Sequence, residues 1–412
     1  MMKPSKSAFS KYQLFVVAIL GLIQFTVILD FMVLSPLGAF LMPELRISSS
    51  QFGLVVSAYA FSAGASGLLA AGFADLFDRK KMLVFFYMGF IIGTLLCGIA
   101  TDYHFLLIAR VVTGLFGGVI SSICFAIITD LFDLSVRGRV MGVVQVAFAG
   151  SQVLGIPVGL FLANHWGWHA PFLMIVAFGV ATVLVIAIGL KPIAEHLKIV
   201  REHNAIQHLI KTFSVKSYLM AFATTILLAT GGFMLMPFAS TFMANNLQIS
   251  ATQLPFVYIV TGVFSMIAGP LVGKLSDSVG KYKVFCYGSI LGMLMVFVYC
   301  NLGITSLWVV MVVNVLLFVA VSSRMIAATT LMTAVPQAKD RGAFMSVNSS
   351  VQQISGGIAS AISGLIVVRT ESGVIKHYDT VGYIVVFTML VCIAMMYFIN
   401  RHLSRPKNLY TA

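Results

Sequence analysis

Three ionisable residues, Asp30, Arg110 and Arg324, stand inside long apolar stretches of this 412-residue chain. Charged side chains in such surroundings are costly, and they usually mark a substrate, ion or proton pathway. An aspartate can take up and release a proton, whereas an arginine stays charged and can hold an anionic group. The three residues therefore favour chemistry in which protons or other charges move over chemistry in which covalent bonds are made.

Asp30 and Arg110 are predicted to lie at the same depth. At about 1.5 Å per residue, Asp30 lies about 24 Å along a helix from Leu14, and Arg110 lies about 8 Å beyond Phe105. If the two helices cross an apolar layer of about 30 Å in opposite directions, both residues fall in its outer third. We therefore predict a proton-coupling site made of Asp30 and Arg110. The alternative is a purely structural ion pair between two helices.

This pairing suggests a coupling mechanism. Burial favours the protonated form of a carboxyl group, whereas a neighbouring arginine favours the carboxylate. A substrate that competes with the ion pair would change the protonation of Asp30 and would couple substrate and proton in opposite directions. For Arg110 we also keep the alternative that it donates to backbone carbonyls of the first helix.

Arg324 is predicted in the inner third of its helix, since it lies about 24 Å from Trp308 at the outer belt. One interpretation is that its long side chain reaches the cytoplasmic surface. The other is that it anchors an anionic group of a substrate.

Polar side chains recur at helical spacing on several apolar stretches and are predicted to line a cavity. Such residues can equally form hydrogen bonds between helices, and phenylalanines can simply face lipid. The predicted substrate-binding residues are Gln24, Thr26, Phe31, Gln145, Phe148, Gln152, Phe233, Asn314, Arg324, Asn348 and Gln352.

The elements that position these residues are long apolar helices. Hydrophobic residues make up 59% of the chain and charged residues only 9%, against about 25% charged in a soluble domain, so a soluble enzyme is excluded. A membrane span needs about 20 apolar residues, and the stretches are continuous rather than alternating as in a membrane β-barrel. We predict twelve spans, near 12–40, 51–73, 82–100, 105–130, 140–162, 170–190, 219–242, 252–275, 284–301, 307–334, 343–368 and 380–400.

The basic residues indicate the orientation. Most of the 26 Lys and Arg residues fall in alternate connections, whereas the opposite side carries only Arg46, Arg369 and Lys376. Because an excess of basic residues marks the cytoplasmic side, both termini are predicted to be cytoplasmic. The formal net charge of +13 thus reflects topology, and no nucleic-acid partner is expected.

Several other kinds of site are not expected. The five cysteines lie in predicted helices without a CxxC pair, so neither a disulfide framework nor a metal site is predicted. The GPLVGK segment at 269–274 has the wrong glycine spacing for a phosphate loop, and no GxSxG or HExxH motif occurs. We expect no cofactor, no metal and no enzymatic activity, so any active transport must draw on a gradient.

The chain repeats itself. The segment AGFADLFDRKK at 71–81 recurs as GKLSDSVGKYK at 273–283, and RGRVM at 137–141 recurs as RGAFM at 341–345. Each pair stands at the same place in a six-span half, so we predict two six-helix bundles with a site between them. The predicted domains are 1–190, a cytoplasmic linker at 191–218, and 219–412.

The 71–81 segment resembles the GxLADRxGRK signature of the major facilitator superfamily. It keeps Asp75, Arg79 and Lys80 and departs from the signature at positions 71, 76 and 78. The resemblance covers the whole chain and implies a transporter with alternating access.

Three further segments resemble motifs of exporters in that superfamily. RVVTGLFGG at 110–118 is similar to the RxxxG motif, and GSQVLGIPVG at 150–159 is similar to a glycine–proline antiporter motif in a looser form. GWHAPF at 167–172 resembles the GWRxxF of efflux permeases. The resemblance implies a relative of drug:proton antiporters and of arabinose- or sugar-efflux permeases.

The resemblance also implies roles outside the cavity. A conformational latch that holds the outward-open state is implied for Asp75, Arg79, Lys80, Asp130 and Asp277, with Arg79 able to pair with Asp130. Ordinary topology would explain the basic residues equally well. Close packing or bending of helices is predicted for Gly155, Pro157, Gly159, Gly269, Pro270 and Gly273.

We therefore predict a secondary active transporter that exports small amphipathic molecules, drugs or metabolites, by proton antiport. One alternative is a proton-coupled importer or a facilitator of sugars, organic anions or lipids. An alternative of another class is a non-transporting membrane receptor or sensor. The expected partners are a small-molecule substrate, protons and the lipid bilayer, with the chain acting as a monomer in the inner (plasma) membrane of a bacterium.

Overall fold

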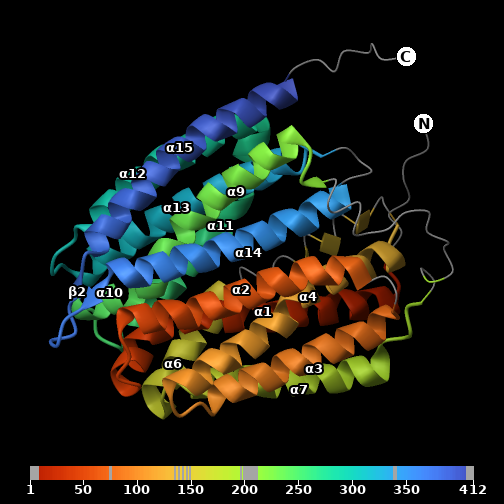
Figure 1. The fold of residues 1–412 in the computed structure, drawn as a ribbon, viewed down its shortest axis with the longest axis horizontal. Helices are drawn as coiled ribbons and strands as arrows, with labels where there is room; N and C mark the ends of the chain where they lie inside the picture. The colour runs from red at the N-terminus through yellow and green to blue at the C-terminus, as the bar shows by residue number, and fades with distance from the viewer. Residues whose placement is uncertain are drawn as a thin grey trace.

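The computed structural model describes residues 9–73, 77–133, 136–137, 140–141, 143–144, 147, 150–194, 197, 212–336 and 341–404, and at 70–73, 152, 341–342 and 404 it describes the backbone alone. The described chain is almost entirely helical, with one antiparallel hairpin of β1 (Val368–Arg369) and β2 (Ile375–Lys376). Its helices form two bundles that lie side by side (Figure 1).

Each half of the chain builds one bundle. The first contains α1 (Lys11–Glu44), α2 (Ser49–Phe73), α3 (Arg79–Gly98), α4 (Tyr103–Leu131), η2 (Ser151–Gly155), α6 (Ile156–Trp166) and α7 (Ala170–Gly189). The second contains α9 (Lys216–Leu235), η4 (Met236–Phe238), α10 (Ala239–Asn245), α11 (Leu254–Val279), α12 (Lys281–Cys300), α13 (Leu307–Met332), α14 (Arg341–Ile366) and α15 (Tyr378–Ser404). Most of the predicted linker at 191–218 lies outside the described residues.

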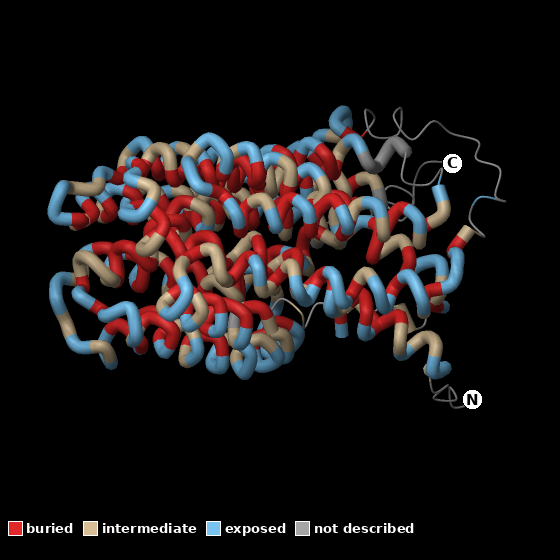
Figure 2. The backbone as a smooth tube through the Cα atoms, turned by 90° about the horizontal axis from the view of Figure 1, so that it is seen from below, coloured by how far each residue is buried: buried red, intermediate tan, exposed pale blue. Residues whose placement is uncertain are grey.

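Length and hydropathy explain most of these helices. Ten described helices are long and apolar enough to cross a membrane. The fifth predicted span is described in part, as η2 and α6, and α14 is long but rich in Ser, Asn and Gln. Many large apolar residues are exposed, among them Ile188 at 88%. Figure 2 shows exposed positions along the outside of both bundles. The predicted all-α membrane fold of two six-helix bundles is confirmed.

The fifth span contains a π-helical turn at the predicted glycine–proline motif. The N–H of Ile156 donates to the carbonyl of Ser151, five residues earlier. Pro157 follows directly, and a proline has no N–H and clashes with the carbonyl four residues before it. A π turn is one way in which a helix absorbs such a break.

The two halves meet along α2 and α14. The hydroxyl of Ser57 donates to the carbonyl of Gly357 at 2.8 Å. A Cβ added at Gly53 would lie 2.9 Å from the carbonyl oxygen of Ser360. Small residues at these positions let the two backbones approach closely.

The halves are also joined at the outer end. Ser35 of α1 donates to the carbonyl of Met236, and Ser240 donates to the carbonyl of Ser35 at 3.0 Å. The rings of Phe52 and Phe238 lie 5.9 Å apart. These residues lie toward the end opposite to the one where α1 begins and α15 ends (Figure 1). With both termini predicted to be cytoplasmic, this is the outer end, and the two halves are in contact there.

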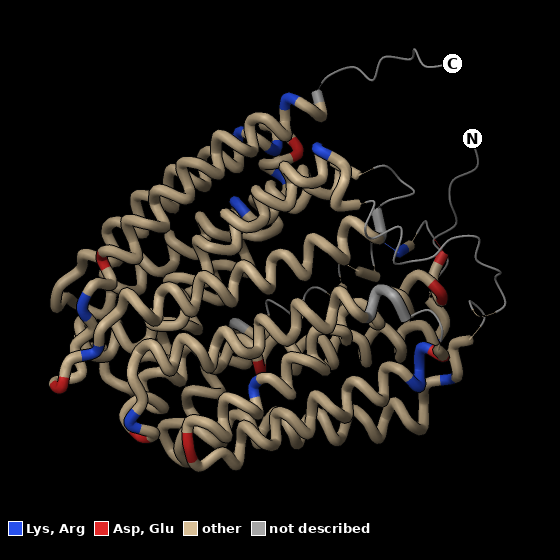
Figure 3. The backbone as a smooth tube through the Cα atoms, viewed as in Figure 1, with Lys and Arg blue, Asp and Glu red and all other residues tan. Residues whose placement is uncertain are grey.

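Charged residues are distributed along the length of the bundles in the same way. Figure 3 shows Lys, Arg, Asp and Glu gathered at the two ends of the bundles, with few positions between them. The exceptions among the described residues include the buried side chains of Asp30, Arg110 and Arg324.

Candidate functional site

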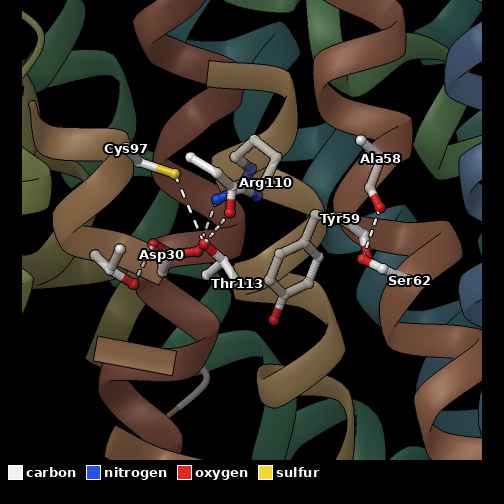
Figure 4. A network of polar contacts seen from close by, with 9 residues as sticks. Asp30, Ala58, Tyr59, Ser62, Cys97, Arg110 and Thr113 are labelled. Atoms are coloured by element: carbon white, nitrogen blue, oxygen red, sulfur yellow. Dashed lines mark hydrogen bonds and ion pairs between the residues drawn. The ribbon is translucent and has the colours of Figure 1, made fainter. Parts of the chain in front are cut away.

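Asp30 of α1 and Arg110 of α4 form an ion pair inside the first bundle. Nη1 of Arg110 donates to Oδ2 of Asp30 at 2.7 Å, and neither side chain has any exposed surface. Figure 4 shows the two side chains pointing toward one another from their helices. A hydrogen bond between two charged groups at this distance is short and strong. The structure thus brings together the two residues that helix depth placed at one level.

Thr94 and Tyr59 complete the surroundings of the pair. The hydroxyl of Thr94 on α3 donates to Oδ1 of Asp30 at 3.1 Å, so both carboxylate oxygens accept a hydrogen bond. The guanidinium carbon of Arg110 lies 4.6 Å from the centre of the Tyr59 ring on α2 (Figure 4). An aromatic face stabilises a cation placed over it. Four helices therefore hold one acid and one base.

Glycines allow these helices to come close enough. A Cβ at Gly114, one turn beyond Arg110, would lie 2.4 Å from the carbonyl oxygen of Tyr59. A Cβ at Gly93 would lie 2.7 Å from the Cα of Thr113. Residues four apart lie on one face of a helix, so the RxxxG spacing brings α2 against α4 beside the arginine.

An aromatic series connects the ion pair to the second bundle. The ring of Phe31, next to Asp30 in the chain, lies 5.3 Å from that of Tyr59 and 5.6 Å from that of Phe233 on α9. The Phe233 ring rests on Gly356 of α14, where a Cβ would lie 2.6 Å from it. Two of the predicted substrate-binding residues, Phe31 and Phe233, thus meet across the interface between the halves.

Two other predicted substrate-binding residues of the first half bond within their own bundle. Gln24 accepts from Ser121 of α4 at 3.2 Å, and Thr26 bonds with the hydroxyl of Tyr87 of α3 at 2.8 Å. Both side chains are buried. Gln145 and Phe148, together with the side chain of Gln152, lie outside the described residues.

The predicted amides of the second half also bond between helices. Asn314 of α13 donates to Thr261 of α11 at 2.9 Å, and Asn348 of α14 accepts from Thr225 of α9 at 2.6 Å. Gln352 is half-buried on α14. Asn314 takes the place in the second half that Arg110 takes in the first, so a neutral hydrogen bond stands where the first half has a charge.

Arg324 points into the second bundle. Its Nε donates to the hydroxyl of Ser289 on α12 at 3.0 Å, and the guanidinium lies 5.6 Å from the ring of Phe285. Only 4% of the residue is exposed. The side chain therefore does not extend to the cytoplasmic surface, which was one of the two interpretations of its position.

At the cytoplasmic end, two of the predicted latch residues form an ion pair within the first half. Nε of Arg79 donates to Asp130 at 3.1 Å, and Lys80 donates to the carbonyl of Ala187 at 3.0 Å. Asp277 is exposed near the end of α11. Asp75 lies outside the described residues, so its part in the latch stays a prediction.

The predicted packing glycines differ between the two halves. A Cβ at Gly155 would lie 2.5 Å from Leu29, and one at Gly159 would lie 2.8 Å from Val33, so both glycines bring the fifth span against α1. The close packing or bending predicted for Gly269 and Gly273 stays a prediction. No heavy atom of a described residue lies within 4 Å of either Cβ position.

Pro270 lies between those two glycines, inside α11, and is exposed. The inner part of α11 lies beyond its contact with the fifth span at Gly262, where a Cβ would be 2.9 Å from Val153. Val272 and Ser276 of this inner part are buried, so it packs through other residues, and the packing or bending predicted for Pro270 stays a prediction.

Tyr59 and Thr94 are the site residues that sequence reasoning missed. Each lies on a helix for which no charged residue drew attention, and a lone Tyr or Thr in an apolar span is an ordinary core residue. The repeat held one usable signal, because Tyr59 and Thr261 are 202 positions apart, the offset that also separates Asp75 from Asp277 in the repeated segments. Chemically, the Asp30–Arg110 pair can hold or release one proton. The described residues contain no group of His, Cys, Asp or Glu suited to a metal ion.

Among the known proteins that are similar to this chain in sequence are two transporters and a multidrug resistance protein. It is 28% identical over 275 residues to the uncharacterized MFS-type transporter YceJ of Bacillus subtilis, covering 65% of this chain and 68% of the relative. It is 32% identical over 151 residues to Multidrug resistance protein 3 of the same organism, covering 37% of this chain and 30% of the relative. A probable sugar efflux transporter of Mannheimia succiniciproducens is 24% identical over 227 residues, 55% of this chain and 56% of the relative.

Solved structures share the fold at low sequence identity. A bacterial homolog of the human lysosomal transporter Spinster, inward-facing and occupied, has a TM-score of 0.75 at 16% identity, with 96% of this chain and 98% of that chain covered. The nucleoside transporter NupG has a TM-score of 0.73 at 15% identity, with 93% and 98% covered. The model of the Major Facilitator Superfamily matches residues 20–228 and 221–411. With this match over nearly its whole length, the chain belongs to the major facilitator superfamily and is a multi-pass membrane transporter.

Proposed function

We propose that this transporter exports small amphipathic molecules in exchange for protons, with Asp30 as the proton carrier. The observation that carries the proposal is the Asp30–Arg110 pair, neither side chain of which has any exposed surface. A buried carboxylate held by one arginine is a group whose charge can be removed by a single proton. The names of relatives, among them a multidrug resistance protein and a probable sugar efflux transporter, support export.

The exchange follows from competition at one carboxylate. As a carboxylate, Asp30 holds Arg110 and the helices around it. A proton arriving from the outer side removes this charge and weakens the charge-assisted hydrogen bond. A cationic or polar group of a substrate would need the unprotonated form, so proton and substrate exclude one another at this site.

The aromatic series gives this site a connection to the other half. Phe233 of the second bundle contacts Phe31, which contacts Tyr59 beneath Arg110. Separation of the halves would remove Phe233 from Phe31 and uncover this edge of the site. The apolar rings suit the apolar part of an amphipathic molecule. We further propose the inner membrane of a bacterium as the location and the monomer as the working unit, with the latch acting between conformations.

A ligand screen tests the proposal. The purified protein would be melted at acidic and alkaline pH with lipophilic cations such as tetraphenylphosphonium, with sugars, with organic anions and with lysolipids. A ligand at about 100 times its dissociation constant stabilises by about 2.7 kcal/mol. We expect cations to stabilise mainly at alkaline pH, because Asp30 is then unprotonated, and we expect Asp30→Asn to abolish this response.

A matched control is Glu371→Gln, which neutralises an exposed carboxylate in the hairpin. It should respond to cations as the parent does. Stabilisation by sugars, anions or lysolipids that is independent of Asp30 would instead support the importer or facilitator. No ligand response with any class, in a protein that melts cooperatively, would favour a receptor or sensor.

A further inference from the structure

Arg324 of α13 is a buried cation without a counter-charge among the described residues. The residue is 4% exposed, and the ion pairs of the described chain, Arg79 with Asp130 and Arg110 with Asp30, do not include it. The described acids of the second bundle lie at helix ends or in the hairpin. Of the buried arginines in the described chain, Arg79 and Arg110 are therefore neutralised by an aspartate, whereas Arg324 is not.

The polar groups around Arg324 leave hydrogens without acceptors. Nε donates to the hydroxyl oxygen of Ser289, whose own hydrogen has no acceptor among the described residues. Nη2 of Arg324 is buried and has no hydrogen-bond partner there. Cys392 on α15 is an electrostatic neighbour of the same guanidinium. Arginine is a donor only, and serine and cysteine can each still donate one hydrogen.

A bare charge inside a membrane-embedded bundle is expensive, and a bound ion of opposite sign offsets that cost. We infer that Arg324, Ser289 and Cys392 form a binding site for a small monovalent anion, a halide ion or a carboxylate group. Donors without an acceptor complement an anion, as acceptors without a donor complement a cation.

The surroundings favour an anion of low charge. A Cβ at Gly231 would lie 3.8 Å from Nη1 of Arg324, 3.8 Å from Val385 and 3.9 Å from Met389, so the end of the guanidinium has apolar neighbours. The cost of removing an ion from water rises steeply with its charge, which disfavours sulfate or phosphate. Methionine side chains are flexible and can make room for an ion.

This site does not depend on the proposed exchange. It lies between α12, α13 and α15 of the second bundle, whereas the Asp30–Arg110 pair lies in the first. Loss of anion binding at Arg324 can therefore be measured without loss of proton exchange at Asp30, and the reverse.

The test is the melting temperature of the detergent-purified, full-length protein as chloride replaces a bulky sulfonate, which is neither a halide nor a carboxylate, at constant ionic strength. We expect a saturable rise with chloride, which Arg324→Gln abolishes. A titration with acetate distinguishes a site for an inorganic anion from a site that also accepts a carboxylate group. A rise with chloride alone identifies an inorganic anion, and a rise with acetate as well identifies a site open to carboxylate groups.

Two further variants keep the inference testable if Arg324→Gln does not fold. Ser289→Ala removes one hydrogen-bond partner and should weaken chloride binding by about tenfold. Ser323→Ala is the matched control, because Ser323 neighbours Arg324 in the chain but bonds to the carbonyl of Val319. Absence of any chloride or acetate effect in the parent protein, or an unchanged effect in Arg324→Gln or Ser289→Ala, would overturn the assignment.

Discussion

Replacing Asp30 or Arg110 singly should destabilise the protein in two different ways. The pair is 2.7 Å long and has no exposed surface. Removing one member of a buried ion pair leaves an uncompensated charge, at a cost of about 3–5 kcal/mol. Because arginine does not lose its charge in proteins, Asp30→Asn should lower the free energy of unfolding by about that amount at every pH between about 5 and 8.

Arg110→Gln should behave differently, because the remaining carboxyl group can escape its charge by binding a proton. A free aspartate titrates near pH 3.9, and each pH unit above that value is worth about 1.4 kcal/mol. Keeping Asp30 protonated therefore costs about 4 kcal/mol at pH 7 and about 1.5 kcal/mol at pH 5. The folded variant binds more protons than the unfolded chain, so its stability should fall as the pH rises.

The double variant with Asp30→Asn and Arg110→Gln carries no buried charge at this site and should recover much of the loss. We expect a coupling energy of about 3 kcal/mol at pH 7. The assay is chemical denaturation of the detergent-purified protein at pH 5, 6 and 7. Single variants that both lie within about 1 kcal/mol of the parent, or a double variant that loses the sum of both effects, would refute this reasoning.

Two glycine substitutions test the packing that holds the site. Gly114→Ala should lower the free energy of unfolding by about 1–3 kcal/mol, since its Cβ would lie 2.4 Å from the carbonyl oxygen of Tyr59, whereas Gly21→Ala, with nothing within 4 Å, should be near neutral in the same melting series. Gly53→Val should push the halves apart on the outer side, because a Cβ there already lies 2.9 Å from the carbonyl oxygen of Ser360. Spin labels on the outer ends of α1 and α10 should then report a longer distance, and an unchanged distance would contradict the prediction.

The positions of the spans and their orientation could be predicted because the bilayer fixes both. Its thickness sets the length of each apolar stretch, and its two sides sort the basic residues. Depth along a helix follows from a constant rise per residue. For that reason Asp30 and Arg110, on different helices, could be placed at one level before the structure showed them in contact.

Rotation about a helix axis could not be predicted in the same way. Gln24 and Thr26 had the depth of cavity residues, yet their partners Ser121 and Tyr87 belong to the same bundle. The direction in which a side chain points depends on how its helix packs against its neighbours. That packing depends on where both helices carry small residues, so it cannot be read from one helix alone. The same reason explains why Tyr59, whose backbone packs on a glycine of α4, was not found from its own sequence.

Arg324 shows the limit of depth arguments for long side chains. Its position along α13 allowed either a reach to the cytoplasm or a role inside the protein. The choice was decided by Ser289 and Phe285 on a neighbouring helix. No spacing rule connects residues of α12 and α13 in this way, so contact geometry was needed.

The most direct test of proton-coupled export uses inside-out vesicles that contain the transporter, with tetraphenylphosphonium as the first probe and the most stabilising compound of the screen as the second. When the lumen is made acidic, the parent protein and Glu371→Gln should accumulate the probe in exchange for outgoing protons. Asp30→Asn should show no accumulation driven by the pH gradient. Accumulation by Asp30→Asn to the same ratio as the parent would contradict the role of Asp30 as the proton carrier.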